Sequence, residues 1–158
     1  MDYQSTKHLA QLIRGQRWGC LATLKDGNPH ASFVAYVPEV DFSALLIHVS
    51  RLAPHTQNLL ADSRAAFAIT EQDQGNGDPQ ILARVSIQGR ALEVGRDTQD
   101  YPQSRNRYLQ TLSTAGQLFT FSDFILFRLV PEQVRFVAGF AQVWDLDSEH
   151  FKNIAILK

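Results

Sequence analysis

The chain has 158 residues, of which 44% are hydrophobic and 20% are charged, a composition typical of a globular protein with its own core. Its formal net charge of -1 argues against a nucleic-acid partner and against attraction to an anionic membrane surface. No apolar run is long enough to span a bilayer, and residues 1–14 lack the apolar block of a signal peptide. The single Cys20 excludes an internal disulfide, so we expect a cytoplasmic protein.

Hydrophobic periodicity and turn residues predict an ordered series of helices and strands. In chain order the patterns predict a helix over 5–16, strands over 18–24, 30–37 and 44–50, a short helix over 56–61, strands over 64–70 and 81–94, a helix beginning at Asp97 or Thr98, strands over 124–130 and 133–144 separated by a turn at 130–132, and a short helical tail over 149–157. Repeats, linkers and a G-x-G-x-x-G fingerprint are missing. We therefore predict one domain over 1–158, mainly β, forming an antiparallel barrel with flanking helices.

The strand predicted over 30–37 has two distinct faces. Its alternation assigns Ala31, Phe33, Ala35 and Val37 to the core and His30, Ser32, Val34 and Tyr36 to the other side. An apolar outer surface is expected around Val34, Tyr36, Phe136, Phe140 and Trp144. Because such a surface is costly to leave in water, it predicts a dimer.

Polar residues gather at the predicted junction between the strand over 44–50 and the helix that follows it. Ser50, Arg51, His55 and Thr56 lie where a helix presents free backbone N–H groups and the positive end of its dipole. These groups are typical of a phosphate site, and Arg84 is expected to reach it from a neighbouring strand. The same residues also fit an ordinary helix start, which is the commoner structure.

The remaining chemistry-bearing residues are sparse. The spacing of His8, His30, His48, His55 and His150 does not suggest a zinc site, although one axial histidine would suffice for a haem. Cys20 reads as a small buried residue, and no hydrolase motif is present. His30, His48 and Tyr36 are candidate proton donors, but no catalytic residue can be assigned.

Four segments together resemble a known family. They are GCLATLKDGNPHASFV (19–34), LIHVSRLAPHTQNLLADSRA (46–65), GDPQILARVSIQGRA (77–91) and RFVAGFAQVW (135–144). Their order resembles the pyridoxamine 5′-phosphate oxidase-like, FMN-binding split-barrel proteins, and within them the haem-utilisation (HugZ-like) branch. The resemblance covers nearly the whole chain, and the S-R-L-A-x-H-T-x-N-L element is its most specific part.

The resemblance implies a Greek-key split barrel that forms a homodimer with FMN in two clefts between the subunits. By position it places Ser32, Phe33 and Val34 against the isoalloxazine ring, His48 and Val49 along the ribityl chain, Ser50, Arg51, Thr56 and Arg84 at the phosphate, and the partner subunit's Gln142 and Trp144 at the same cleft. In this interpretation the flavin does the redox chemistry and the protein positions it.

The expected function is therefore that of an FMN-dependent oxidoreductase acting on an unidentified small molecule. One alternative is a haem-binding or haem-degrading protein, with His150 as the iron ligand. A second alternative is a flavin-binding module without enzymatic activity. The sequence differs from the proteins it resembles in two ways that bear on the choice between these functions. The chain offers only Arg105 and Arg107 where pyridoxamine 5′-phosphate oxidases carry a set of basic residues, and it stops short of the extra C-terminal domain of larger haem-utilisation proteins.

Overall fold

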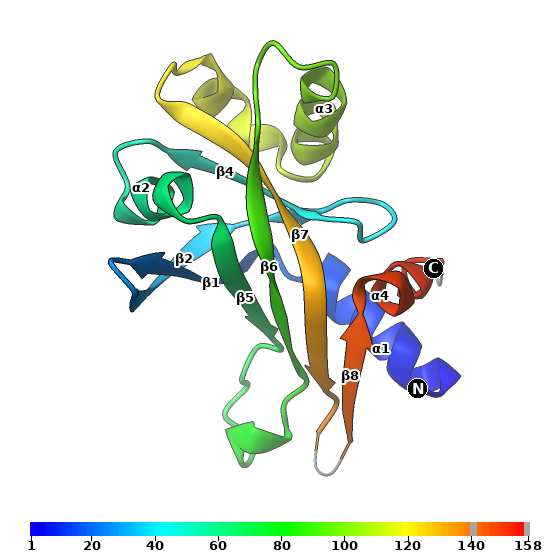
Figure 1. Cartoon of the computed structure of the whole chain (residues 1–158). Helices are drawn as coiled ribbons and strands as arrows, with labels where there is room; N and C mark the ends of the chain where they lie inside the picture. The colour runs from blue at the N-terminus through cyan, green and yellow to red at the C-terminus, as the bar shows by residue number, and fades with distance from the viewer. Residues whose placement is uncertain (140–141, 157–158) are drawn as a thin grey trace.

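The structure, a computed structural model, describes residues 1–139 and 142–156 and is built around one antiparallel sheet. Its described strands follow the order β2-β1-β5-β6-β7-β4-β3, and β8 pairs with β7. All of these pairings are antiparallel, and the helices lie around the edges of the curved sheet (Figure 1). The predicted mainly-β, barrel-type fold with flanking helices is confirmed.

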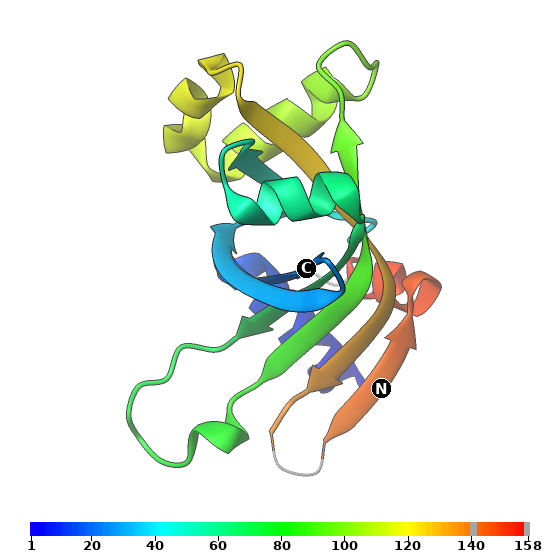
Figure 2. The ribbon, with the colours of Figure 1, turned by 60° about the vertical axis from the view of Figure 1, so that its left-hand side comes forward.

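The described elements follow the predicted order closely. They are α1 (Tyr3–Gly15), β1 (Trp18–Lys25), β2 (Asn28–Ala35), β3 (Val37–Pro38), β4 (Leu45–Ser50), α2 (Pro54–Ala61), β5 (Arg64–Thr70), the 3₁₀ turn η1 (Pro79–Ile81), β6 (Arg84–Val94), α3 (Tyr101–Thr111), the 3₁₀ segment η2 (Ser113–Thr120), β7 (Phe124–Val137), β8 (Val143–Asp147) and α4 (Ser148–Ile154). Helix α2 lies across the β1–β2 hairpin, with α3 and η2 beyond it (Figure 2). Among these helices none has the length and apolar character needed to cross a bilayer.

Strand β7 runs straight through the position where a turn was predicted at 130–132. Pro131 has no N–H group for the ladder, and it lies opposite Gly89 where the register between β6 and β7 shifts. A Cβ atom on Gly89 would lie 1.9 Å from the Val130 carbonyl oxygen, so only glycine lets the two backbones approach. The strand therefore continues through an irregularity of the β-bulge kind, and the predicted turn was wrong.

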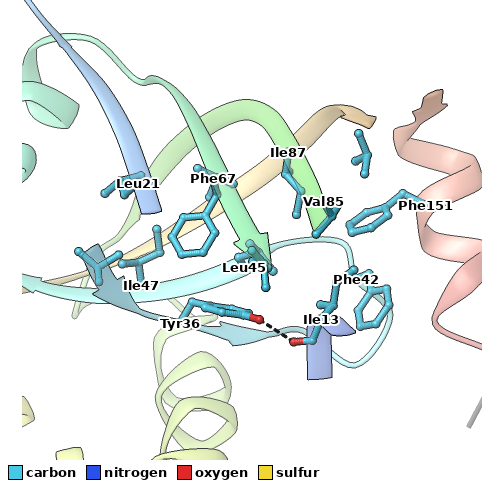
Figure 3. Close-up of a cluster of buried hydrophobic side chains, with 14 of the residues drawn as sticks. Ile13, Leu21, Tyr36, Phe42, Leu45, Ile47, Phe67, Val85, Ile87 and Phe151 are labelled. Atoms are coloured by element: carbon cyan, nitrogen blue, oxygen red, sulfur yellow. Dashed lines mark hydrogen bonds between the residues drawn. The ribbon is translucent and has the colours of Figure 1, made fainter. Parts of the chain in front are cut away.

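Aromatic and aliphatic side chains from β4, β5 and β6 fill the core against α1 and α4 (Figure 3). Tyr36 is fully buried at its centre, and its hydroxyl donates to the Ile13 carbonyl oxygen at 2.8 Å. The Phe67 ring meets Tyr36 edge-on, with 5.1 Å between the ring centroids. Burial raises the pKa of the Tyr36 phenol. Tyr36 is therefore a core residue that ties α1 to the sheet, and its prediction as a proton donor was wrong.

Strand β2 presents the opposite faces from those predicted. Val34 is buried, whereas the side chain of Phe33 is 60% exposed. Phe33 stacks on the exposed Trp18 of β1, with ring centroids 5.8 Å apart and planes 15° from parallel. The pattern was misread because both faces of this strand carry apolar residues, so the alternation alone does not say which one meets the core.

The apolar outer surface therefore lies elsewhere than predicted. Phe136 is fully buried and Trp144 is half-buried against it, while Phe140 lies outside the described residues. The exposed apolar surface is instead formed by β1, β2 and β5, and we call it the outer face. It comprises Trp18 and Phe33 together with small residues brought to the same side by the strand register, namely Cys20, Ala22, Ala31, Ala35, Ala66 and Ala68.

Candidate functional site

The junction between β4 and α2 forms because an apolar strand is followed by a proline that opens a helix. Pro54 occupies the first turn of α2, where its missing N–H costs nothing, and Ala53 precedes it without a side-chain cap. Ser50 ends β4 opposite Phe124 of β7. Ser50 and Arg51 therefore precede α2 directly, and Thr56 lies in the first turn of this helix.

Most backbone donors of this junction are already engaged within the protein. The Arg51 N–H donates to the Asp123 carbonyl oxygen at 2.6 Å, and the Leu52 N–H donates to the Ser50 hydroxyl oxygen at 3.1 Å. The N–H groups of Ala53, Thr56 and Gln57 also donate to carbonyl oxygens of the junction. An incoming anion would have to displace these bonds, so the junction is not an open cradle of N–H groups.

The two side chains expected to bind phosphate most directly are each paired with a carboxylate. The Ser50 hydroxyl donates to Asp123 Oδ2 at 2.7 Å, and Arg51 Nη2 lies 3.2 Å from Glu93 Oε1. Thr56 is fully buried, and its hydroxyl has no hydrogen-bond partner among the described residues. As they stand, the Ser50 hydrogen and one Arg51 nitrogen already face negative charges, which disfavours a phosphate group at these residues.

The two β4 residues expected along a ribityl chain point into packed interior. Val49 belongs to the main core, and His48 lies flat against Phe119 of η2, with ring centroids 3.7 Å apart and planes 4° from parallel. Both His48 ring nitrogens are buried without a partner among the residues described. Burial, helped by the nearby charge of Arg96, lowers the pKa of His48 to about 4. A neutral, enclosed imidazole of this kind is not placed to donate protons to a ligand.

A second polar group lies between β2 and α2. Ser32 Oγ is 3.1 Å from His55 Nδ1, and both side chains are partly buried. Burial and then the neighbouring His30 lower the pKa of His55, which keeps its ring neutral near pH 7. His30 Nδ1 is buried and unpartnered in the described structure. His30 and Ser32 share one face of β2, as predicted. This face points toward α2, whereas Phe33 lies on the opposite, exposed face of the strand.

The other residues predicted at the cofactor do not meet the junction within one chain. Arg84 begins β6 and donates to the carbonyl oxygens of Gln80 and Leu82. Glu93, which does reach the junction, lies nine residues further along β6, or about 30 Å at strand spacing. Arg84 therefore lies at the far end of β6 from this junction, and its role at a phosphate stays a prediction.

Gln142 and Trp144 lie at the β7–β8 hairpin, also remote from β4 in sequence and pairing. Trp144 stacks on Phe136, with centroids 5.8 Å apart, and Gln142 is exposed. Their role was assigned to a partner subunit, so it stays a prediction.

The two arginines considered as substitute phosphate ligands instead fasten α3 to the body of the protein. Arg107 Nε donates to the Pro38 carbonyl oxygen at 2.9 Å. The Arg105 guanidinium lies 5.5 Å from the centroid of the Phe119 ring, within cation–π range. Residues 1–139 and 142–156 contain no group of three His, Cys, Asp or Glu side chains suited to a metal ion.

His150 is the histidine most open to a ligand. Its side chain is 71% exposed on the first turn of α4, and its Nδ1 lies 2.8 Å from Asp147 Oδ1. Hydrogen bonds from His150 lower the pKa of Asp147, so the carboxylate is ionised and Nδ1 acts as the donor. A neutral imidazole with this hydrogen bond has its Nε2 lone pair free, which is the arrangement of most metal-binding histidines.

Comparison with known proteins places the chain in a family. A family model described as pyridoxamine 5′-phosphate oxidase matches residues 5–138. The chain belongs to this family. It is 29% identical to the haem oxygenase HutZ of Vibrio cholerae over 143 residues, covering 87% of this chain and 78% of that protein. It is 30% identical to the chloroplastic non-canonical haem oxygenase HOZ of Arabidopsis thaliana over 140 residues, covering 85% of this chain and 40% of the plant protein.

The solved structure of a haem-binding protein from Mycobacterium smegmatis superposes with a TM-score of 0.85 at 28% identity. The match covers 97% of this chain and 62% of that one. The chain thus spans well under two thirds of the plant relative and slightly under two thirds of the mycobacterial protein. These similarities confirm the split-barrel fold and the predicted relation to the haem-utilisation branch.

Proposed function

We propose that this protein binds haem and takes part in its degradation, with His150 as the iron ligand. The observation that carries the proposal is the His150–Asp147 pair, which exposes one imidazole nitrogen while a carboxylate holds the other. Similarity to relatives named haem oxygenase supports haem as the molecule that is bound. The iron of a bound haem would supply the site of oxygen chemistry, and the protein would fix the ring and its axial donor.

Titration with hemin tests this proposal. The wild-type protein should give a saturable Soret band, and His150→Ala should lose it or weaken hemin binding by about 10- to 100-fold. His8→Ala is the matched control, because His8 is also a partly exposed helical histidine but has its Nε2 bound to Glu71 at 2.6 Å. A wild-type protein without a saturable Soret band would refute haem binding. Unchanged hemin binding by His150→Ala would show that His150 is not the iron ligand.

An FMN-dependent oxidoreductase is the second candidate. The family match favours it, and Ser50, Arg51 and Thr56 do lie together at the start of α2. We rank it below haem because the carboxylates of Asp123 and Glu93 lie against Ser50 and Arg51, where a flavin phosphate would have to bind. A flavin spectrum retained by the protein through desalting would reverse this order. A flavin-binding module without turnover, and a cytoplasmic location inferred from the lone Cys20, stay predictions.

We also propose that two copies of the chain associate through the outer face. The stacked residues Trp18 and Phe33 are 58% and 60% exposed, and a pocket of about 300 Å³ between β1, β5 and β6 is lined in part by Ala22 and Ala66 of the outer face. Further along the sheet, Arg135 of β7 forms an ion pair with Asp145 of β8. A self-complementary contact of this composition is typical of homodimers.

The mass of the protein in solution at micromolar concentration tests the dimer. We expect a dimeric wild-type mass and a monomeric Phe33→Asp variant, because the introduced carboxylate would be buried without a partner. Leu52→Asp is the matched control, since Leu52 is 85% exposed but lies at the β4–α2 junction, outside the outer face. A monomeric wild-type mass, or equal dissociation by both variants, would contradict the proposal.

A further inference from the structure

We infer that Asp123 and Glu93 fill the anion site at the β4–α2 junction with the protein's own carboxylates and so exclude phosphorylated ligands from it. They act as specificity-determining residues at a junction that otherwise has the donors of a phosphate site: the Ser50 hydroxyl, the Arg51 guanidinium and the buried Thr56 hydroxyl. The inference concerns phosphate binding alone and does not depend on whether the chain binds haem.

Strand pairing fixes the position of Asp123. The antiparallel register of β4 and β7 ends with Ser50 opposite Phe124, and the next backbone bond, from Arg51 N–H to the Asp123 carbonyl oxygen, extends it by one residue. Asp123 is therefore held beside the end of β4 by the ladder itself. Its carboxylate accepts the Ser50 hydroxyl hydrogen at 2.7 Å, and a serine hydroxyl has only that one hydrogen to donate.

Glu93 pairs with the Arg51 guanidinium of the same junction. It lies near the end of β6, and its Oε1 is 3.2 Å from Arg51 Nη2. A phosphate that bound to both Ser50 and Arg51 would meet the negative charges of Asp123 and Glu93 at short range. Arg96, whose guanidinium donates to the Phe121 carbonyl oxygen, is a further cation beside this segment.

Removing the two negative charges should therefore open the site. Asp123→Asn removes the negative charge and adds an amide NH2 group that can donate to a phosphate, and Glu93→Gln keeps the shape of the side chain. Neither substitution touches the backbone bond that places Asp123. The double variant leaves the Arg51 charge without its Glu93 partner, with Arg96 as a further cation nearby, which favours a phosphate dianion.

The experiment measures binding of FMN and of riboflavin, which differ only in the phosphate, by quenching of flavin fluorescence. We expect the Asp123→Asn/Glu93→Gln variant to bind FMN at least about tenfold more tightly than the wild type does, while riboflavin affinity changes by less than about twofold. The control, Glu132→Gln/Asp145→Asn, removes the same number of charges at the β7–β8 end of the sheet, where these residues pair with Arg90 and Arg135. It should bind FMN as weakly as the wild type.

Three results would overturn the inference: wild-type FMN affinity equal to that of the double variant, an equal gain for riboflavin, or an equal gain in the control. Far-ultraviolet circular dichroism and the two single variants check that the double variant is folded, and a folded variant without the gain also refutes it. Tight FMN binding by the wild type would support the flavin candidate, whereas the hemin titration tests the haem proposal separately.

Discussion

Gly89→Ala should destabilise the protein by about 3 kcal/mol or more, a large share of the 5–15 kcal/mol that stabilises a typical domain. The new Cβ atom would lie 1.9 Å from the Val130 carbonyl oxygen and 2.9 Å from the Val130 carbonyl carbon. Both are backbone atoms of β7, so no rotamer change relieves the clash. Urea denaturation followed by circular dichroism measures the loss.

Gly116→Ala is the matched control for this experiment. Gly116 lies in η2, and a Cβ atom there would meet nothing within 4 Å. Because alanine also restricts the unfolded chain more than glycine does, this variant should be neutral or more stable by up to about 1 kcal/mol. Gly89→Ala with a free energy of unfolding as high as that of the control would contradict the bulge geometry.

Acidification from pH 7 to pH 4 should remove about 2–3 kcal/mol of stability through His48 alone. The folded protein holds this imidazole 7% exposed between aromatic rings, with a pKa of about 4, against 6.5 for the free group. Between these two values the unfolded chain binds a proton that the folded chain excludes. The loss therefore begins as the pH falls through 6.5 and levels off near 4.

His48→Leu isolates this effect, because leucine has a similar volume and does not titrate. The variant should be more stable than the wild type at pH 5, and its free energy of unfolding should change less between pH 7 and pH 5. The lowered pKa of His55 contributes in the same direction and remains in both proteins. Parallel stability curves for the wild type and His48→Leu would rule out His48 as the cause.

The fold was largely predictable because its signals are local. Periodicity located most helices and strands, and the K-D-G-N-P turn placed the β1–β2 hairpin correctly. The errors arose where a local signal has two meanings. Pro131 predicts a turn in isolation, but it also fits a bulge when a glycine lies opposite on the neighbouring strand.

The site was harder to predict because its decisive contacts are distant in sequence. Ser50 and Asp123 are 73 positions apart, and Arg51 and Glu93 are 42 apart. The sequence places hydroxyl and guanidinium groups at a helix start, but the strand order decides which carboxylates come beside them. The signal that would have found Asp123 is the pairing of β4 with β7, which local patterns do not reveal.

The length of β7 also bears on how accurately the chain finds its native arrangement. This one strand pairs with β4, β6 and β8, so three ladders share its residues. A slip of β7 by one residue would turn its side chains to the wrong face of all three pairings at once, and would also carry Pro131 away from Gly89. A misaligned strand therefore loses far more than a local contact, and the shared strand discriminates strongly against misfolded registers.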